Sequence, residues 1–135
     1  MEQPDYACGL ISDAGGNLLL QLRPPAARHA ANLLTCFGGA REAGESALDC
    51  LVRELQEELG WIPPRPETRP VQLFADERWI AAFYPVRLDP GITLTTEPGF
   101  CLVRAPLMVL PGLPLSPWHA LVIAGWQRGA ERVHL

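Results

Sequence analysis

The 135-residue sequence contains no lysine, and its eleven basic residues are all arginine. They form no basic stripe and the formal net charge is −4, so a groove that binds a polynucleotide is not expected. No apolar run reaches the ~18 residues that suggest a membrane span. The first residues, MEQPDYACGLISD, lack a basic segment ahead of an apolar stretch, so we expect no secretory signal and a cytoplasmic location.

Cysteine is present only four times, and the four residues lie far apart in the chain. There is no C-x-x-C pair and no cluster of cysteine with histidine, which excludes a recognisable zinc site. Buried, reduced thiols are the expected state, and nothing requires an oxidising compartment. With 48% hydrophobic and 19% charged residues, the composition predicts a globular protein with one domain over residues 1–135.

Apolar runs separated by turn residues predict a mixed sheet with helices packed on it. Strands are expected at residues 6–12, 18–22, 33–37, 71–75, 79–88 and 100–104, and helices at residues 46–59 and 117–128. The first two strands flank DAGGN, which is typical of a hairpin turn. Pro117 at the first helical position and Ser116 as its cap predict the start of the last helix. This pattern alone indicates an α/β or α+β fold.

The helix at residues 46–59 has the clearest signals in the chain. Ser46 is a good N-terminal cap, and Gly60 supplies the stop. An apolar stripe at helical spacing is expected to face the core. It consists of Leu48, Leu51, Leu55 and Leu59.

Three carboxylates on the same helix, Glu54, Glu57 and Glu58, fall within an arc of roughly 100° beside the leucine stripe. Adjacent carboxylates raise one another's pKa values unless a cation neutralises them. Oxygen ligands without sulfur suit a hard divalent ion such as Mg²⁺ or Mn²⁺. A solvated acidic helix face explains the arc equally well. Arg53 is expected to pair with Glu45 and brace the preceding loop against the helix.

The spacing of these residues resembles the signature of the Nudix hydrolases, G-x5-E-x7-R-E-U-x-E-E-x-G-U, in which U is a large apolar residue. The matching residues are Gly39, Glu45, Arg53, Glu54, Leu55, Glu57, Glu58, Gly60 and Trp61. The resemblance covers 23 consecutive residues and implies an α/β/α sandwich with a mixed sheet. It implies that Glu54, Glu57 and Glu58 bind catalytic divalent metal, with Mg²⁺ expected and Mn²⁺ an alternative. Arg53 belongs to the catalytic signature. Together with Glu45, it would brace the loop against the helix.

The resemblance also implies a base that deprotonates the attacking water, and two residues compete for this role. Glu54 lies in the signature helix, whereas Glu97 lies in a predicted loop between strands. Family members often carry a metal-binding or general-base glutamate in such a loop. Glu77 is a competitor of Glu97 for the loop position, and an ordinary surface acid is the alternative for both.

Candidate substrate contacts are spread over the first and last parts of the chain. Gly38 and Gly39 would shape a loop over the diphosphate. The other candidates are Arg23 and Arg41 for phosphate oxygens, His29 and Asn32 for the nucleotide, and Trp118 for stacking on a base. Surface positions for the arginines, a turn role for Asn32 and a core position for Trp118 are the alternatives.

The expected reaction is metal-assisted hydrolysis of a nucleoside diphosphate linked to another moiety. A (deoxy)nucleoside triphosphate is the leading substrate, as in the MutT-like members. ADP-ribose or a nucleotide sugar is the rival, and a non-catalytic nucleotide-sensing module is the alternative from another class. The expected partner is thus a small nucleotide, with no polynucleotide and no membrane. The oligomeric state stays open, a homodimer included.

Overall fold

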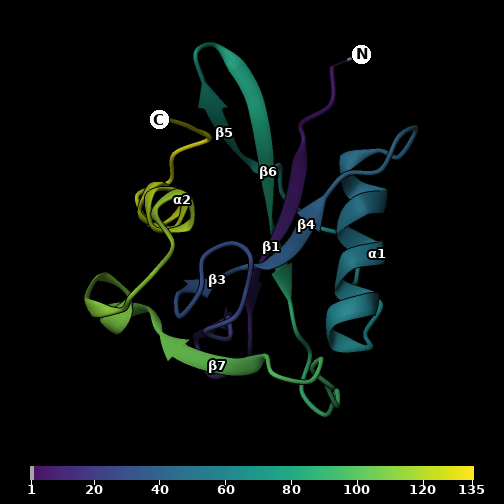
Figure 1. Cartoon of the computed structure of the whole chain (residues 1–135), viewed down its shortest axis with the longest axis vertical. Coiled ribbons are helices and arrows are strands. Elements are labelled where there is room, and N and C mark those ends of the chain that lie inside the picture. Colours follow the sequence, from purple (N-terminus) through teal and green to yellow (C-terminus); the bar gives the residue numbers. More distant parts are fainter. Residues whose placement is uncertain (1) are drawn as a thin grey trace.

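The computed structural model describes residues 2–135 as one mixed sheet between two helices (Figure 1). The strands are β1 (Tyr6–Ser12), β2 (Asn17–Leu22), β3 (Leu34–Thr35), β4 (Phe37–Ala40), β5 (Val71–Ala75), β6 (Arg78–Arg87), β7 (Cys101–Pro106) and β8 (Arg132–His134). The helices are α1 (Ala47–Leu59), the 3-10 helix η1 (Leu107–Gly112) and α2 (Pro117–Gln127). None of the helices in residues 2–135 combines the length and the apolar character that crossing a membrane requires.

Strand β1 lies at the centre of the sheet and organises its neighbours. It pairs in parallel with β6 along its whole length, from Tyr6 opposite Ala81 to Ser12 opposite Arg87. On its other edge it pairs antiparallel with β4 over its first residues and with β2 only at Ser12 opposite Leu18. The predicted hairpin is therefore present only at its turn, because β2 departs from β1 and pairs with β7 instead.

Two hydrophobic clusters, one on each face of the sheet, hold the helices in place. Successive β1 side chains alternate between the faces, as the period of a strand requires. Ala7 and Ile11 belong to the cluster under α1, and Cys8 and Leu10 belong to the cluster under α2. Figure 1 shows α1 and α2 on opposite sides of the sheet. The fold is an α/β/α sandwich with a mixed sheet, as predicted.

Helix α1 forms as its terminal signals predict. The Ser46 Oγ accepts a hydrogen bond from the Asp49 N–H at 3.1 Å, and Gly60 ends the helix in a left-handed conformation. Leu51, Leu55 and Leu59 are completely buried, whereas Leu48 is only partly buried. Cys50, which the predicted stripe omitted, is also completely buried.

Several element boundaries differ from the predictions. The strand expected at residues 33–37 is two strands, β3 and β4, which pair with different neighbours, β2 and β1. η1 and β8 were not predicted, and β8 is only three residues long. Ser116 precedes α2 as expected, but its side chain makes no capping hydrogen bond. Its backbone is used instead, because its N–H donates to the Leu34 carbonyl.

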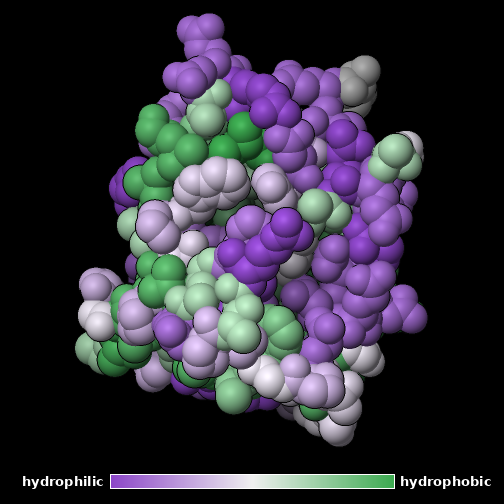
Figure 2. Space-filling model, viewed as in Figure 1, coloured by the Kyte–Doolittle hydropathy of each residue, from purple (hydrophilic) through white to green (hydrophobic). Residues whose placement is uncertain are grey.

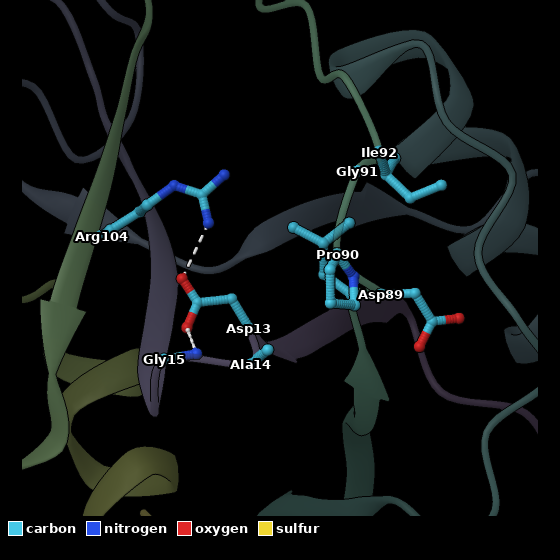
Figure 3. A pocket seen from close by; sticks show the side chains of 9 residues that line it. Asp13, Ala14, Gly15, Asp89, Pro90, Gly91, Ile92 and Arg104 are labelled. Carbon is cyan, nitrogen blue, oxygen red and sulfur yellow. Dashed lines mark hydrogen bonds and ion pairs between the residues drawn. The ribbon is translucent and has the colours of Figure 1, made fainter.

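The turn between β1 and β2 is fixed by Asp13, which lines a small cavity of about 200 Å³ (Figure 3). Its carboxylate accepts hydrogen bonds from the N–H groups of Gly15 and Asn17 and from Arg104 on β7, the last at 2.7 Å. The Asn17 N–H is the largest of the effects that lower the pKa of Asp13 to about 2, and the Arg104 guanidinium adds to it. Asp13 therefore ties the turn to β7.

We expect Asp13→Asn to lower the melting temperature at pH 7 by roughly 2–5 °C, because it loses the charge-assisted bond to Arg104. The folded-state pKa lies below the unfolded value, so this contribution is present above pH ~4 and is lost as the pH falls toward 2. Thermal melts at pH 7 and pH 2.5 measure it. A difference between variant and parent that stays constant over this range would contradict the assignment.

Candidate active site

The backbone of Gly38 and Gly39, in β4, passes very close to its neighbours. At Gly38 φ is +145°, and a Cβ there would lie 2.5 Å from the Cα of Cys8. At Gly39 a Cβ would lie 2.7 Å from the carboxylate carbon of Glu54. Only glycine fits at Gly38, because a Cβ there would meet backbone atoms of β1, whereas a Cβ at Gly39 would displace the Glu54 carboxylate that rests against β4.

Arg53 is the centre of the charge network on α1. Its guanidinium binds Glu45 through two hydrogen bonds of 2.7 and 3.0 Å, so the predicted pair is present. It also donates to the Ala40 carbonyl at 3.1 Å and to Glu54 at 3.0 Å. The bidentate bond lowers the pKa of Glu45 to about 2. Arg53 thus connects the loop before α1, the end of β4 and one carboxylate of the signature.

Glu58 is the most buried of the three signature carboxylates, with 8% of the residue exposed. Its Oε1 accepts the Gly38 N–H at 2.8 Å, and its Oε2 accepts from Gln21 Nε2 at 3.4 Å. Burial raises the pKa of Glu58 to about 8, and the nearby charges of Glu54 and Glu97 add to this effect. A carboxylate in such a position is favourable for binding a cation.

The three carboxylates project from one side of α1, and Glu54 and Glu57 both pair with Arg53 but differ in burial. Glu57 is 57% exposed and lies 3.4 Å from Arg53, whereas Glu54 is largely buried and its pKa is raised by burial. Within residues 2–135, no three carboxylate, histidine or cysteine side chains converge in a geometry ready to hold a metal. Glu54, Glu57 and Glu58 still suit a hard divalent ion, because all their possible ligand atoms are oxygens. Glu54 and Glu58 are also poorly solvated.

A cavity of about 770 Å³ opens beside the glycines and extends between the sheet and the start of α2. Five predicted contact residues line it: Arg23, His29, Gly38, Gly39 and Trp118. A volume of several hundred Å³ is typical of sites for small ligands. In Figure 2 the α1 side of the molecule is hydrophilic, and more hydrophobic residues gather on the side of α2 and η1. Glu54, Glu57 and Glu58 do not line the cavity themselves, and the contacts of Glu54 and Glu58 with Gly39 and Gly38 connect the carboxylates to it.

Arg41 and Asn32 do not line this cavity. The Arg41 guanidinium donates to the Pro4 carbonyl at 2.7 Å and to the Glu45 carbonyl at 3.0 Å, which favours a bracing role over phosphate binding. Asn32 has a φ of +62°, and its N–H donates to the Arg23 carbonyl. This geometry agrees with the turn role that was the alternative for Asn32.

The loop that carries Glu97 is attached to the end of α1, because the Thr95 N–H donates to the Leu59 carbonyl at 3.0 Å. Glu97 is exposed, and its charge acts on the pKa of Glu58. Glu77 instead occupies the tight turn between β5 and β6 with a φ of +65°. Figure 1 shows that turn at the opposite end of the molecule from the loop that precedes β7. Of the two loop acids, only Glu97 is positioned to act at this site.

Several cavity residues were not predicted from the sequence. Thr35 and His119 line its inner wall, and Tyr6 contacts Trp118 edge to face at its opening, with 5.8 Å between ring centroids. Cys8 and Cys36 also line it. None belongs to a motif, so only their positions in the folded chain reveal them.

We expect Arg53→Lys to lower both the melting temperature and turnover. Lysine cannot reproduce the two parallel hydrogen bonds to Glu45 together with the bond to the Ala40 carbonyl. A loss of about 1–3 kcal/mol in unfolding free energy is expected, because hydrogen bonds to charged groups are removed. Chemical denaturation measures the stability, with Arg65→Lys in the exposed connector as the control. Unchanged stability would show that the network does not brace the loop.

The comparisons with known proteins agree with this geometry. Residues 2–123 match the family model described as the NUDIX domain, so the chain belongs to the Nudix family. It is a Nudix hydrolase, an enzyme that acts on phosphoanhydride bonds. Members of the family generally require divalent metal and act on small nucleotide substrates.

Solved structures show the same fold. The MutT protein from Methanosarcina mazei Go1 is 19% identical with a TM-score of 0.72, and the alignment covers 95% of this chain and 96% of that one. The MutT NUDIX hydrolase from Burkholderia pseudomallei is 25% identical with a TM-score of 0.69, covering 91% and 98%. An Ap4A hydrolase from C. elegans is 15% identical with a TM-score of 0.72, covering 91% and 96%. No curated protein matches the sequence significantly.

Proposed function

We propose that this protein hydrolyses (deoxy)nucleoside triphosphates to the monophosphate and pyrophosphate in the presence of Mg²⁺. The observation that carries the proposal is that Glu54 and Glu58 contact Gly39 and Gly38, two residues that line a cavity of about 770 Å³. The glycine-lined end, next to Glu54 and Glu58, suits metal-bound phosphates, and the apolar residues of the cavity suit a nucleoside. The similarity to two proteins named MutT supports this substrate class.

Glu54, Glu57 and Glu58 would hold the metal, for which Mg²⁺ is the natural choice and Mn²⁺ a substitute. When bound, such an ion polarises a phosphoryl group and makes water more acidic. The missing side chains of Gly38 and Gly39 let β4 pass close to β1 and to Glu54, and the two glycines line the cavity in which the phosphate chain would lie. Arg23 lines the cavity and donates to the His29 carbonyl at 2.7 Å, and its remaining N–H groups would donate to phosphate oxygens.

Glu54 is the proposed base that removes a proton from the attacking water. Its carboxylate is held between Arg53 and Gly39, and burial raises its pKa, both of which suit a group that must accept a proton from a fixed direction. Glu97 is the alternative, because its loop is joined to the end of α1 and is exposed. We favour Glu54 since its position on the helix is the better defined.

Release of pyrophosphate and of phosphate, measured separately with Mg²⁺ over a nucleotide panel, tests the proposal. The panel includes the common ribo- and deoxynucleoside triphosphates, oxidised forms, ADP-ribose, a nucleotide sugar and a diadenosine polyphosphate. We expect the highest kcat/KM with a triphosphate and pyrophosphate as the product. Preferential cleavage of ADP-ribose or a dinucleotide would move the protein to another substrate class. Release from no member of the panel would indicate a nucleotide-sensing module.

Divalent metal is expected to raise the melting temperature, because a ligand that binds only the folded state stabilises it. At a concentration ten times the dissociation constant the gain is about 1.4 kcal/mol, which corresponds to a few degrees. The melts are recorded with and without a nucleotide, at constant ionic strength. Glu58→Gln is the control and is expected to show a smaller shift. Equal shifts in parent and variant would argue that the ion binds elsewhere.

A further inference from the structure

Gln21, on β2, is a buried polar residue with only 2% of its surface exposed. Its backbone is held on both edges, because β2 pairs there with β3 and with β7. Both ends of its side-chain amide are used within the protein. Oε1 accepts a hydrogen bond from Arg23 Nη1, and Nε2 donates to Glu58 Oε2, each at 3.4 Å. Gln21 therefore links a residue of the cavity to a signature carboxylate.

The charges on either side of the Gln21 amide fix its orientation. The amide oxygen faces the Arg23 guanidinium, and the NH₂ group faces the Glu58 carboxylate. A flipped amide would place its oxygen against the carboxylate and its NH₂ group against the guanidinium, so both contacts would be repulsive. The two bonds are long, but each has a charged partner and the amide is shielded from water, which strengthens both. The amide thus presents its donor to Glu58 from one fixed direction.

Glu58 receives one hydrogen bond on each carboxylate oxygen, and the two donors come from different strands. The Gly38 N–H of β4 donates to Oε1 at 2.8 Å, and Gln21 of β2 donates to Oε2. A carboxylate oxygen can accept two hydrogen bonds, so each oxygen keeps a lone pair for a further ligand. Rotation of the carboxylate would break one bond or the other. The two donors together therefore fix the direction of the remaining lone pairs.

Both donors to Glu58 are neutral, which distinguishes it from the other two signature carboxylates. Glu54 and Glu57 pair with Arg53, whereas Glu58 forms no ion pair within residues 2–135. The Arg23 guanidinium would compete with a bound cation if it reached Glu58, and the Gln21 amide lies between the two. A neutral donor orients the carboxylate and leaves its charge to a cation.

We propose that Gln21 is a positioning residue that orients the Glu58 carboxylate for the divalent ion. The inference rests on the proposed function, which assigns Glu58 to the metal. Groups that hydrogen-bond a metal ligand fix its direction, and their loss typically weakens metal binding by about 10–100-fold. A glutamine that only satisfied buried polar atoms would affect stability and leave metal affinity unchanged. Metal affinity therefore separates the two roles.

Two substitutions remove the hydrogen bond to Glu58 in different ways. Gln21→Met keeps nearly the same size but has no N–H group, and Gln21→Asn keeps an amide on a side chain that is one methylene group shorter. Gln72→Met, a half-buried strand glutamine on β5, is the matched control. Each Gln21 variant is also combined with Glu58→Gln, because an effect that passes through Glu58 must disappear when that carboxylate is already lost.

The experiment measures the dissociation constant of Mn²⁺ from the electron paramagnetic resonance signal of the free ion, without nucleotide. We expect Gln21→Met and Gln21→Asn each to weaken Mn²⁺ binding by about tenfold. In the Glu58→Gln background the same substitutions should change the affinity by less than about twofold. Gln72→Met should match the parent. Melting temperatures of all variants, recorded in the same buffer, show that the compared proteins are folded.

Unchanged Mn²⁺ affinity in both Gln21 variants would overturn the inference, as would an equal loss of affinity with and without the Glu58 carboxylate. Failure of both variants to fold would assign Gln21 to the stability of the sheet and also overturn it.

The same measurements separate the inference from the proposed function. No binding of Mn²⁺ by the parent up to millimolar concentration would overturn the inference together with the proposed metal site. Triphosphate hydrolysis by a parent whose Mn²⁺ affinity does not depend on Gln21 would leave the proposed function standing and refute the inference. Mn²⁺ affinity that depends on Gln21 through Glu58, in a protein that hydrolyses no triphosphate, would support the inference and refute the proposed function.

Discussion

Glu57→Gln and Glu58→Gln are each expected to lower kcat/KM by about 10³-fold with the fold retained. Both residues belong to the proposed metal site, and stabilisation of phosphoryl charge by a bound ion contributes several kcal/mol to a reaction of this kind. Glutamine keeps the size of the side chain, so the packing of α1 should not change. The assay is pyrophosphate release from the best triphosphate at several Mg²⁺ concentrations.

The two variants also differ in a way that the structure predicts. Glu58 is buried and its carboxylate interacts unfavourably with that of Glu54, so its replacement should leave the melting temperature equal or higher. Glu57 is exposed and lies near Arg53, so its replacement should change stability little. Glu67→Gln in the exposed connector is the matched control and should retain full activity. Near-parental activity in both variants would refute the assignment of these carboxylates to the metal.

The second large effect concerns the base. We expect Glu54→Gln to reduce kcat by about 10²–10⁴-fold, the range typical of general base catalysis, and Glu97→Gln to reduce it less. Glu54 is held against Gly39 and bonded to Arg53, whereas Glu97 is exposed on a loop. Single-turnover kinetics with saturating nucleotide separate the chemical step from binding.

Metal affinity, measured by Mn²⁺ titration, distinguishes the possible roles of Glu54. Retained affinity with reduced kcat would support a base, whereas collapse of affinity in Glu54→Gln would make the residue a ligand first. A larger loss of kcat in Glu97→Gln would move the base to the loop. Glu77→Gln, in the turn at the other end of the sheet, is the control for a loop glutamate and should have no effect.

Features set by nearby residues could be predicted from the sequence. Helix α1 starts and stops at local signals, Ser46 and Gly60, and the Arg53–Glu45 bond follows from their spacing. The long-range strand pairings could not be predicted, because β1 pairs with β6 and β2 with β7 across large separations. The predicted hairpin is present, but for this reason its two strands pair only next to the turn. A turn sequence specifies how two strands begin but not which neighbours they keep.

In the candidate site, too, some features could be predicted from the sequence and others could not. The positions of Glu54, Glu57 and Glu58 on one helix follow from periodicity, but the partners of Glu58 do not. Gln21 comes from β2 and the Gly38 N–H from β4, and neither contact has a sequence signal. Thr35 and His119 were missed because each is unremarkable alone. His119 is brought to the cavity by its hydrogen bond with the Cys36 N–H, which joins the residue between β3 and β4 to α2.

The separation of β2 from β1 has a consequence for how such an enzyme can diversify. Because β1 pairs with β4 at one end and meets β2 only at the other, the cavity wall is assembled from segments that come from distant parts of the chain. The proposed metal ligands, in contrast, all belong to the continuous stretch at residues 38–61. We therefore expect substitutions at the start of α2 or in β3 to alter ligand choice without changing the proposed metal ligands. A new substrate preference would then require few mutations and no change in the proposed catalytic residues.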